Sequence, residues 1–520
     1  MKISKYMAFG AVAISAMFTS CVGDLDVTPE DPDVKVEPSS KAEMESLLGA
    51  LYYDLLTGDG LDVSDGGAGS FTRCHFNLQE IVADECFISD KWNDPGYTVL
   101  NFNIWGTDNE WQYAAYSREN HLAKIASVYI NDLHKFGPAY YTEDEIKALD
   151  AEARTLRALA NYYLIDLFGR GPWITEDSPT GAIPETYDRK QLFDGTVADL
   201  KAHVDNLVPA AQQVYGRVSR EAGYMLLAKL YLNAEVYTGT PMWQECADAL
   251  KHVVETGLEL APEYKYLFCA SNDKYVGNGE IIWGVPQRIA FCETFGGTTY
   301  LTVGAWMVPD TEDENDPVRV QLKKLNSPND TWAGLRLRPE LSKALKGDPR
   351  RLIFEGTYQE EIPDLESYDE KSCGYMLIKY TNTLETDYYN EAGDNNGNAA
   401  CSDTDYPLFR LADAYLMLAE CQLHGVNCNG YEYLNKVRAR VGLDPISNPS
   451  ATEILHERQC ELYMEGHRRS DLIRFGRYTG STYLWSWKGG VYSGASIPDY
   501  RALFAIPYQY VATVGQNPGY

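Results

Sequence analysis

Few groups in this sequence stand at spacings that support catalysis. His456 and Glu457 begin the zinc-protease pattern H-E-x-x-H, but Cys460 stands where the second histidine is needed. The chain has only 8 histidines, and it contains no nucleophile elbow, Walker A loop or Rossmann fingerprint. A carboxylate pair for glycoside hydrolysis stays open, because 75 acidic residues offer many pairs and none is marked out. The loop 271–278 carries oxygen ligands suited to calcium, but Lys274 interrupts it and we predict a simple turn.

Aromatic side chains are the other group that could do chemistry here, by stacking on a ligand. The chain has 38 Tyr, 10 Trp and 16 Phe, and such rings pack well against the C–H faces of sugars. Trp92 and Trp332 stand among Asn, Asp, Gly and Pro in irregular segments, so ligand stacking and core packing are both open for them. Trp105, Trp111 and Trp306 lack that context, and we predict that they pack in the core.

Amphipathic helices must position these residues. Apolar side chains recur at helical spacing in six segments, namely 150–168, 220–237, 243–257, 408–423, 430–442 and 454–466. Gly169 stands where the first of them should end. Alanines on the contact stripes favour tetratricopeptide-like helix pairs. We therefore predict a mostly α-helical body at 41–520, with a helical scaffold at about 120–260 and 405–475 and a loop-rich binding face at about 60–115 and 265–400.

The N-terminal residues predict export and a lipid anchor. Lys2 and Lys5 precede a short apolar stretch, and small residues lead into Cys21, which is the layout of a lipoprotein signal peptide over residues 1–20. Residues 21–40 would be the acylated cysteine and a flexible acidic leash, because they hold few large apolar groups. Two or three acyl chains on Cys21 would anchor the protein firmly.

Net charge restricts the possible partners, whereas the cysteine content leaves disulfide bonding undecided. The net charge of −30 argues against nucleic acid and favours a neutral ligand. Ten cysteines remain beyond Cys21, none of them in a C-x-x-C pair, so disulfides and buried thiols are both open.

Several motifs in a fixed order resemble one family. They are the lipobox at Cys21, LFRLADAY at 408–415, LNKVRAR at 434–440, EGHRRSDLIRFG at 465–476 and the C-terminal AIP and QNPGY. From end to end the chain is similar to the SusD/RagB family of Bacteroidetes outer-membrane lipoproteins. The resemblance implies a body of tetratricopeptide-like helix pairs with a loop-rich binding face. It also implies a protein that binds glycan without cutting it and passes it to a TonB-dependent barrel of the SusC type.

The charged motif near the C-terminus has a structural interpretation. Glu457, Glu461 and Glu465 recur at helical spacing, and Arg458, Arg468, Arg469 and Arg474 lie close by in the sequence. We interpret them as an ion-pair and capping network that joins the last helix to the fold. A site for phosphate or uronate is the alternative.

The resemblance is strongest to the starch-binding member of the family, in stretches such as FTRCHFN at 71–77 and FGGTTYL at 295–301. It implies a glycan site formed by Arg73, Trp92, Asn93, Phe295 and Trp332. Phe295 replaces a tyrosine of the starch binder, and Trp92 stands alone where that protein has two tryptophans.

The resulting hypothesis is a lipoprotein of the outer membrane, facing the exterior, that captures starch or a related α-glucan. A different glycan, a peptide ligand and a surface glycoside hydrolase are the alternatives.

Overall fold

The computed structural model describes residues 37–56, 69–88, 95–178, 183–290, 294–308, 313–325, 327, 331–369, 371–387 and 401–520. Cys21, Trp92 and Asn93 lie outside these ranges. Helices dominate the described part, and its strands are short and form two-stranded sheets. No helix in the described part is both long and apolar enough to cross a membrane.

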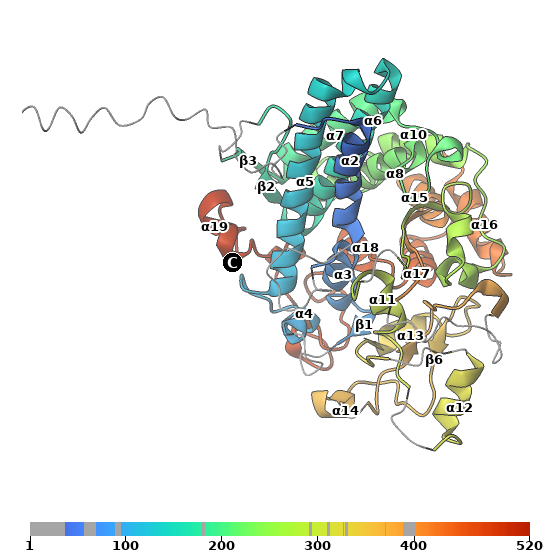
Figure 1. The fold of residues 1–520 in the computed structure, drawn as a ribbon. Helices are drawn as coiled ribbons and strands as arrows, with labels where there is room; N and C mark the ends of the chain where they lie inside the picture. Colours follow the sequence, from blue (N-terminus) through green and yellow to red (C-terminus); the bar gives the residue numbers. More distant parts are fainter. Residues whose placement is uncertain are drawn as a thin grey trace, which may run out of the picture.

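Packed helix pairs form the scaffold (Figure 1). The three pairs are α5 (Glu110–Phe136) with α6 (Glu143–Tyr163), α8 (Arg220–Leu232) with α10 (Trp243–Val254), and α15 (Leu411–Leu423) with α16 (Gly430–Arg440). Their facing sides carry alanines and larger apolar residues that join one continuous core. The helices predicted at 243–257 and 430–442 are confirmed, with ends that differ by a few residues. The helix predicted at 220–237 is interrupted at Asn233, after which α9 (Ala234–Thr238) follows.

Helix α6 shows how the sequence sets its own ends. The Thr142 hydroxyl accepts from the Glu145 N–H, and the Glu145 carboxylate accepts from the Thr142 N–H, which together form a capping box. The helix then widens into the π-turn η4 (Leu164–Phe168) and stops at Gly169, which has a φ of 67°. A glycine is suited to that left-handed position, so the predicted helix end is confirmed.

The segment predicted as a helix from residue 408 begins as a strand. Strand β8 (Tyr406–Arg410) pairs antiparallel with β4 (Ile281–Val285), and helix α15 starts only at Leu411. Arg410 has extended backbone angles, and its guanidinium bonds Glu280, Glu461 and Glu465. The prediction was therefore wrong for residues 408–410, because tertiary pairing overrode the helical pattern.

The charged motif is confirmed as a buried ion-pair network, although most of the partners come from elsewhere in the sequence. Glu461 on α17 (Ala451–Leu462) accepts from Arg350, Arg410 and Arg440. Burial alone would raise the pKa of Glu461, but the three guanidinium groups lower it to about 2. The four arginines of the predicted network are also paired. Arg458 pairs with Asp413, Arg468 with Asp84, Arg469 with Asp166, and Arg474 with Glu420. The side chains of these residues are at most 6% exposed and are paired with one another, which favours the network over an anion site.

Cysteine chemistry is also settled within the described residues. All nine described cysteines are free thiols, and every one except Cys428 is buried.

Glu80 and Glu85 are two buried glutamates whose carboxyl groups interact with each other. The backbone N–H groups of Gly466 and His467 donate to the Glu80 carboxyl group, and the Met464 N–H donates to Glu85. Burial raises the pKa of Glu80 to about 7, and burial together with the Glu80 charge raises the pKa of Glu85 well above its ordinary value. The pair therefore holds a proton that the unfolded chain would release.

This pair predicts a stability that falls with rising pH. Between the ordinary glutamate pKa of 4.5 and about 7, the folded state binds more protons than the unfolded state, so the free energy of unfolding decreases as pH increases. Glu85→Gln is expected to make that decrease shallower in urea unfolding at pH 5, 6, 7 and 8. Glu432→Gln, at an exposed carboxylate, should follow the parent slope. If the free energy of unfolding fell with pH at the same slope in all three proteins, the raised pKa values of Glu80 and Glu85 would be contradicted.

Candidate functional site

The structure brings two of the expected aromatic residues together. The ring centroids of Phe295 and Trp332 lie 5.9 Å apart, with the ring planes tilted by 59°. Phe295 is 51% exposed, which is unusual for so large an apolar side chain, and Trp332 is half-buried. The pair therefore presents aromatic surface that the core does not use. We call Phe295 and Trp332 the aromatic pair.

Backbone contacts fix the position of Trp332. The Trp332 N–H donates to the Val303 carbonyl at 3.0 Å, and the Gly334 N–H donates to the Gly304 carbonyl at 3.0 Å. The indole lies directly on Gly304, because a Cβ built there would be 3.0 Å from its Cε3 atom. A side chain at position 304 would therefore displace the ring. Such close backbone approach is a common reason for glycine.

A glycine turn places Phe295 at the surface. Helix α11 (Gly297–Thr302) begins just after it, and Gly297 has a φ of 55°. A Cβ at Gly297 would lie 2.6 Å from Gln287, so this position requires glycine for conformation and for space. The Gly297 N–H donates to the Ser70 hydroxyl at 3.4 Å, which ties the turn to the cap of helix α3 (Phe71–Phe76). Phe295 thus projects outward from an anchored turn.

Arg73 occupies a different environment from the aromatic pair. It is only 1% exposed, and its guanidinium lies 4.7 Å from the Tyr300 ring centroid and 5.0 Å from that of Trp111. It also donates to the Tyr97 hydroxyl at 2.9 Å. These contacts join α3, α4 (Tyr97–Asn101), α5 and α11, so Arg73 braces the elements around the pair. Its direct contact with a ligand stays a prediction.

The residues that flank 89–94 contact the same elements. Ile88 is held by hydrogen bonds with the Asn101 side chain, and the Pro95 carbonyl accepts from the Trp111 indole at 3.1 Å. Tyr97 stacks on Trp111 with centroids 4.7 Å apart. Ile88 and Pro95, the nearest described residues on either side of 89–94, therefore lie against α4 and α5. The roles of those two residues stay predictions.

Trp105, Trp111 and Trp306 are at most 1% exposed, so their prediction as core residues is confirmed. In the loop 271–278, the Asn272 amide donates to two carbonyls and Asp273 pairs with Arg288. Among the described residues, no cluster of His, Cys, Asp and Glu could hold a metal ion. Sequence reasoning missed the roles of Tyr97 and Tyr300, which are buried against Arg73.

The chain is similar in sequence to several known proteins. Residues 312–516 match the SusD family, a region that includes Trp332 and Glu461 of the ion-pair network. The whole chain is 28% identical to the starch-binding protein SusD of Bacteroides thetaiotaomicron, over 98% of this chain and 97% of that protein. The chain is therefore similar to the SusD family over residues 312–516 and to SusD over nearly its whole length. It is also 26% identical to the SusD-like protein P25 of Formosa agariphila, over 88% of each chain.

Solved structures of SusD-like proteins share the fold. A laminarin-binding SusD-like protein aligns with a TM-score of 0.67 and 24% identity, over 92% of this chain and all of that one. The surface glycan-binding protein A of Bacteroides thetaiotaomicron, solved with laminarihexaose, aligns with a TM-score of 0.69 and 18% identity over the same shares. At these identities the likeness establishes the mostly helical SusD-like fold of the chain.

Proposed function

We propose that this SusD-like chain is a non-catalytic glycan-binding lipoprotein that captures starch or a related α-glucan at the cell surface. The observation that carries the proposal is the aromatic pair, whose tilted and partly exposed rings stand on a braced base. The match to the starch-binding protein SusD over nearly the whole chain supports the same ligand class.

The geometry suits a curved glucan. Flat, parallel rings fit a straight chain of sugars, whereas rings inclined by 59° can follow a surface that turns. Each stacked ring contributes on the order of 1 kcal/mol, so a few rings give micromolar to millimolar affinity. Weak, shape-based capture is suitable for a protein that must release its ligand to a transporter.

Surface location and delivery complete the proposal. Cys21 would be acylated and would hold the protein to the outer membrane, facing the exterior, while residues 21–40 serve as a leash. The partner would be a TonB-dependent barrel of the SusC type, onto which the body delivers its oligosaccharide. Cys21 and most of the leash lie outside the described residues, so the signal-peptide pattern and the similarity to SusD support this part.

Affinity electrophoresis tests the ligand class. The purified protein should be retarded in gels that contain amylopectin, relative to plain gels and to bovine serum albumin. Laminarin gels distinguish a β-glucan binder, and an assay for reducing ends during incubation with amylopectin distinguishes a hydrolase. Retardation only by laminarin would reject the α-glucan assignment, and released reducing ends would reject a non-catalytic role. Absence of retardation in every glycan gel, together with oligopeptide binding, would favour a peptide-capturing protein.

A further inference from the structure

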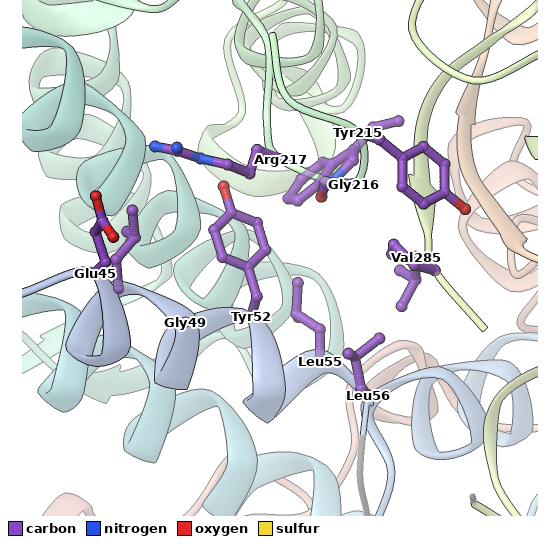
Figure 2. Close-up of a pocket in the computed structure, with 12 residues that line it drawn as sticks. Glu45, Gly49, Tyr52, Leu55, Leu56, Tyr215, Gly216, Arg217 and Val285 are labelled. Atoms are coloured by element: carbon purple, nitrogen blue, oxygen red, sulfur yellow. The ribbon is translucent and has the colours of Figure 1, made fainter. Parts of the chain in front are cut away.

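A pocket of about 390 Å³ lies between helix α2 (Lys41–Leu56) and the segment around Gly216 (Figure 2). Its lining does not include Arg73, Phe295 or Trp332. Figure 2 shows Glu45, Gly49 and Tyr52 along one side of α2, with Tyr215 and Arg217 opposite. The volume falls within the range of small-molecule sites, which are usually 300 to 1,000 Å³.

The walls of this pocket are mainly apolar and already formed. Leu48, Leu55, Leu56, Val285 and Pro286 line it together with Trp283, a core residue that is only 1% exposed. The pocket thus reaches inward to a buried ring, unlike a flat contact surface. Gly216 has a φ of 81°, and a Cβ there would lie 2.6 Å from Pro286, so the glycine lets these two wall segments meet.

The polar atoms of the walls already have partners in the protein. The Tyr52 hydroxyl donates to Glu152 and accepts from the Val218 N–H at 3.0 Å. Arg217 is bound by the same Glu152, with Nε donating to Oε1 at 2.7 Å.

Two further polar groups of the walls, on Trp283 and Tyr215, are engaged in the same way. The Trp283 indole donates to the Gly216 carbonyl at 3.3 Å. The Tyr215 hydroxyl donates to Asp405 and accepts from Arg288 at 3.2 Å. A ligand would gain little by competing for these groups, so shape and apolar contact must provide its affinity.

The charge at the mouth narrows the ligand further. Glu45 is exposed, and it makes no ion pair with any other residue that the structure describes. Its carboxylate repels anions, as does the net charge of −30. We propose that this pocket binds an uncharged ring compound, aromatic or alicyclic, independently of the glycan site. An extended anionic or strongly polar molecule fits neither the walls nor the mouth.

Two fluorescent probes with the same ring skeleton test this assignment. N-phenyl-1-naphthylamine is uncharged, and 8-anilinonaphthalene-1-sulfonate adds only a sulfonate. The uncharged probe should show a saturable fluorescence increase and bind at least about tenfold more tightly than the sulfonate. Glu45→Gln should narrow that difference. The absence of saturable binding by the uncharged probe, or equal affinity for both probes, would overturn the proposal.

A matched pair of variants locates the probe. A side chain added at Gly49 begins in open space at the pocket, so Gly49→Trp fills it without a clash and removes a helix-destabilising glycine. Ala50→Trp places the same indole at the next position, which is exposed and does not line the pocket. Gly49→Trp should weaken the uncharged probe at least about tenfold, while Ala50→Trp leaves its affinity unchanged. Equal binding by both variants, or equal loss in both, would place the probe elsewhere and overturn the proposal.

Discussion

Trp332→Ala is expected to abolish retardation in amylopectin gels while the midpoint of thermal unfolding changes little. The indole is half-buried and supports Phe295, so its removal takes away one stacking surface and the support of a second. Losing about 1 to 2 kcal/mol of stacking raises the dissociation constant about tenfold, which moves a weak complex out of the range of the gel. Trp332→Phe keeps a ring at this position and should retain part of the retardation.

A second tryptophan provides the matched control. Trp243 on α10 is also half-buried and stacks on His424 with ring centroids 3.9 Å apart, but it is not part of the aromatic pair. Trp243→Ala should lose a similar amount of ring contact without losing retardation. If Trp332→Ala instead unfolds the chain at much lower temperature and still binds amylopectin, Trp332 is a packing residue and the proposed site is wrong.

The sequence predicted helices well where one face repeats and less well where partners are distant. Helix α6 carries its own capping box and terminal glycine, so its end could be read locally. Residues 408–410 have the same apolar character as the helix that follows them. Their pairing with β4, more than a hundred residues earlier in the chain, makes them a strand. Local patterns contain no information about such a partner.

The candidate site shows the same division. Phe295 was named as a site residue through the family resemblance, and it is exposed. No local signal shows that Arg73 would be buried among Tyr97, Trp111 and Tyr300, because these residues come from three separate helices. The Glu80–Glu85 contact was likewise missed, since two acids five residues apart are unremarkable until a fold buries both.

The sequence predicted that an ion-pair network would form, but it did not identify most of the residues that pair in it. The spacing of Glu457, Glu461 and Glu465 predicted one helix face, but α17 ends at Leu462 and Glu465 lies beyond it. Arg350, Arg410 and Lys379, which pair with these glutamates, belong to segments that local sequence does not connect. A network of this kind links the helical scaffold to the loop-rich part that carries Trp332, so its loss should affect the whole body.

Glu461→Ala is therefore expected to be severely destabilising. The change leaves Arg350, Arg410 and Arg440 buried with one acceptor fewer, and removing one member of a buried ion pair typically costs about 3 to 5 kcal/mol. Urea unfolding at pH 7 measures the loss. Glu432→Ala, at an exposed position on α16, should change the free energy of unfolding by less than about 0.5 kcal/mol. Similar values for both variants would mean that the network contributes little.

The pH dependence separates this network from the Glu80–Glu85 pair. The folded pKa of Glu461 is lowered to about 2, so its stabilisation is complete above the ordinary value of 4.5 and is lost as pH falls toward 2. The raised pKa of the Glu80–Glu85 pair has the opposite effect on stability, because its stabilisation is lost as pH rises toward 7. Removing Glu461 should thus flatten the acid limb of the stability curve and leave the limb between pH 5 and 7 in place. Removing Glu85 should do the reverse, so unfolding curves of the two variants across both limbs assign each limb to its own carboxyl group.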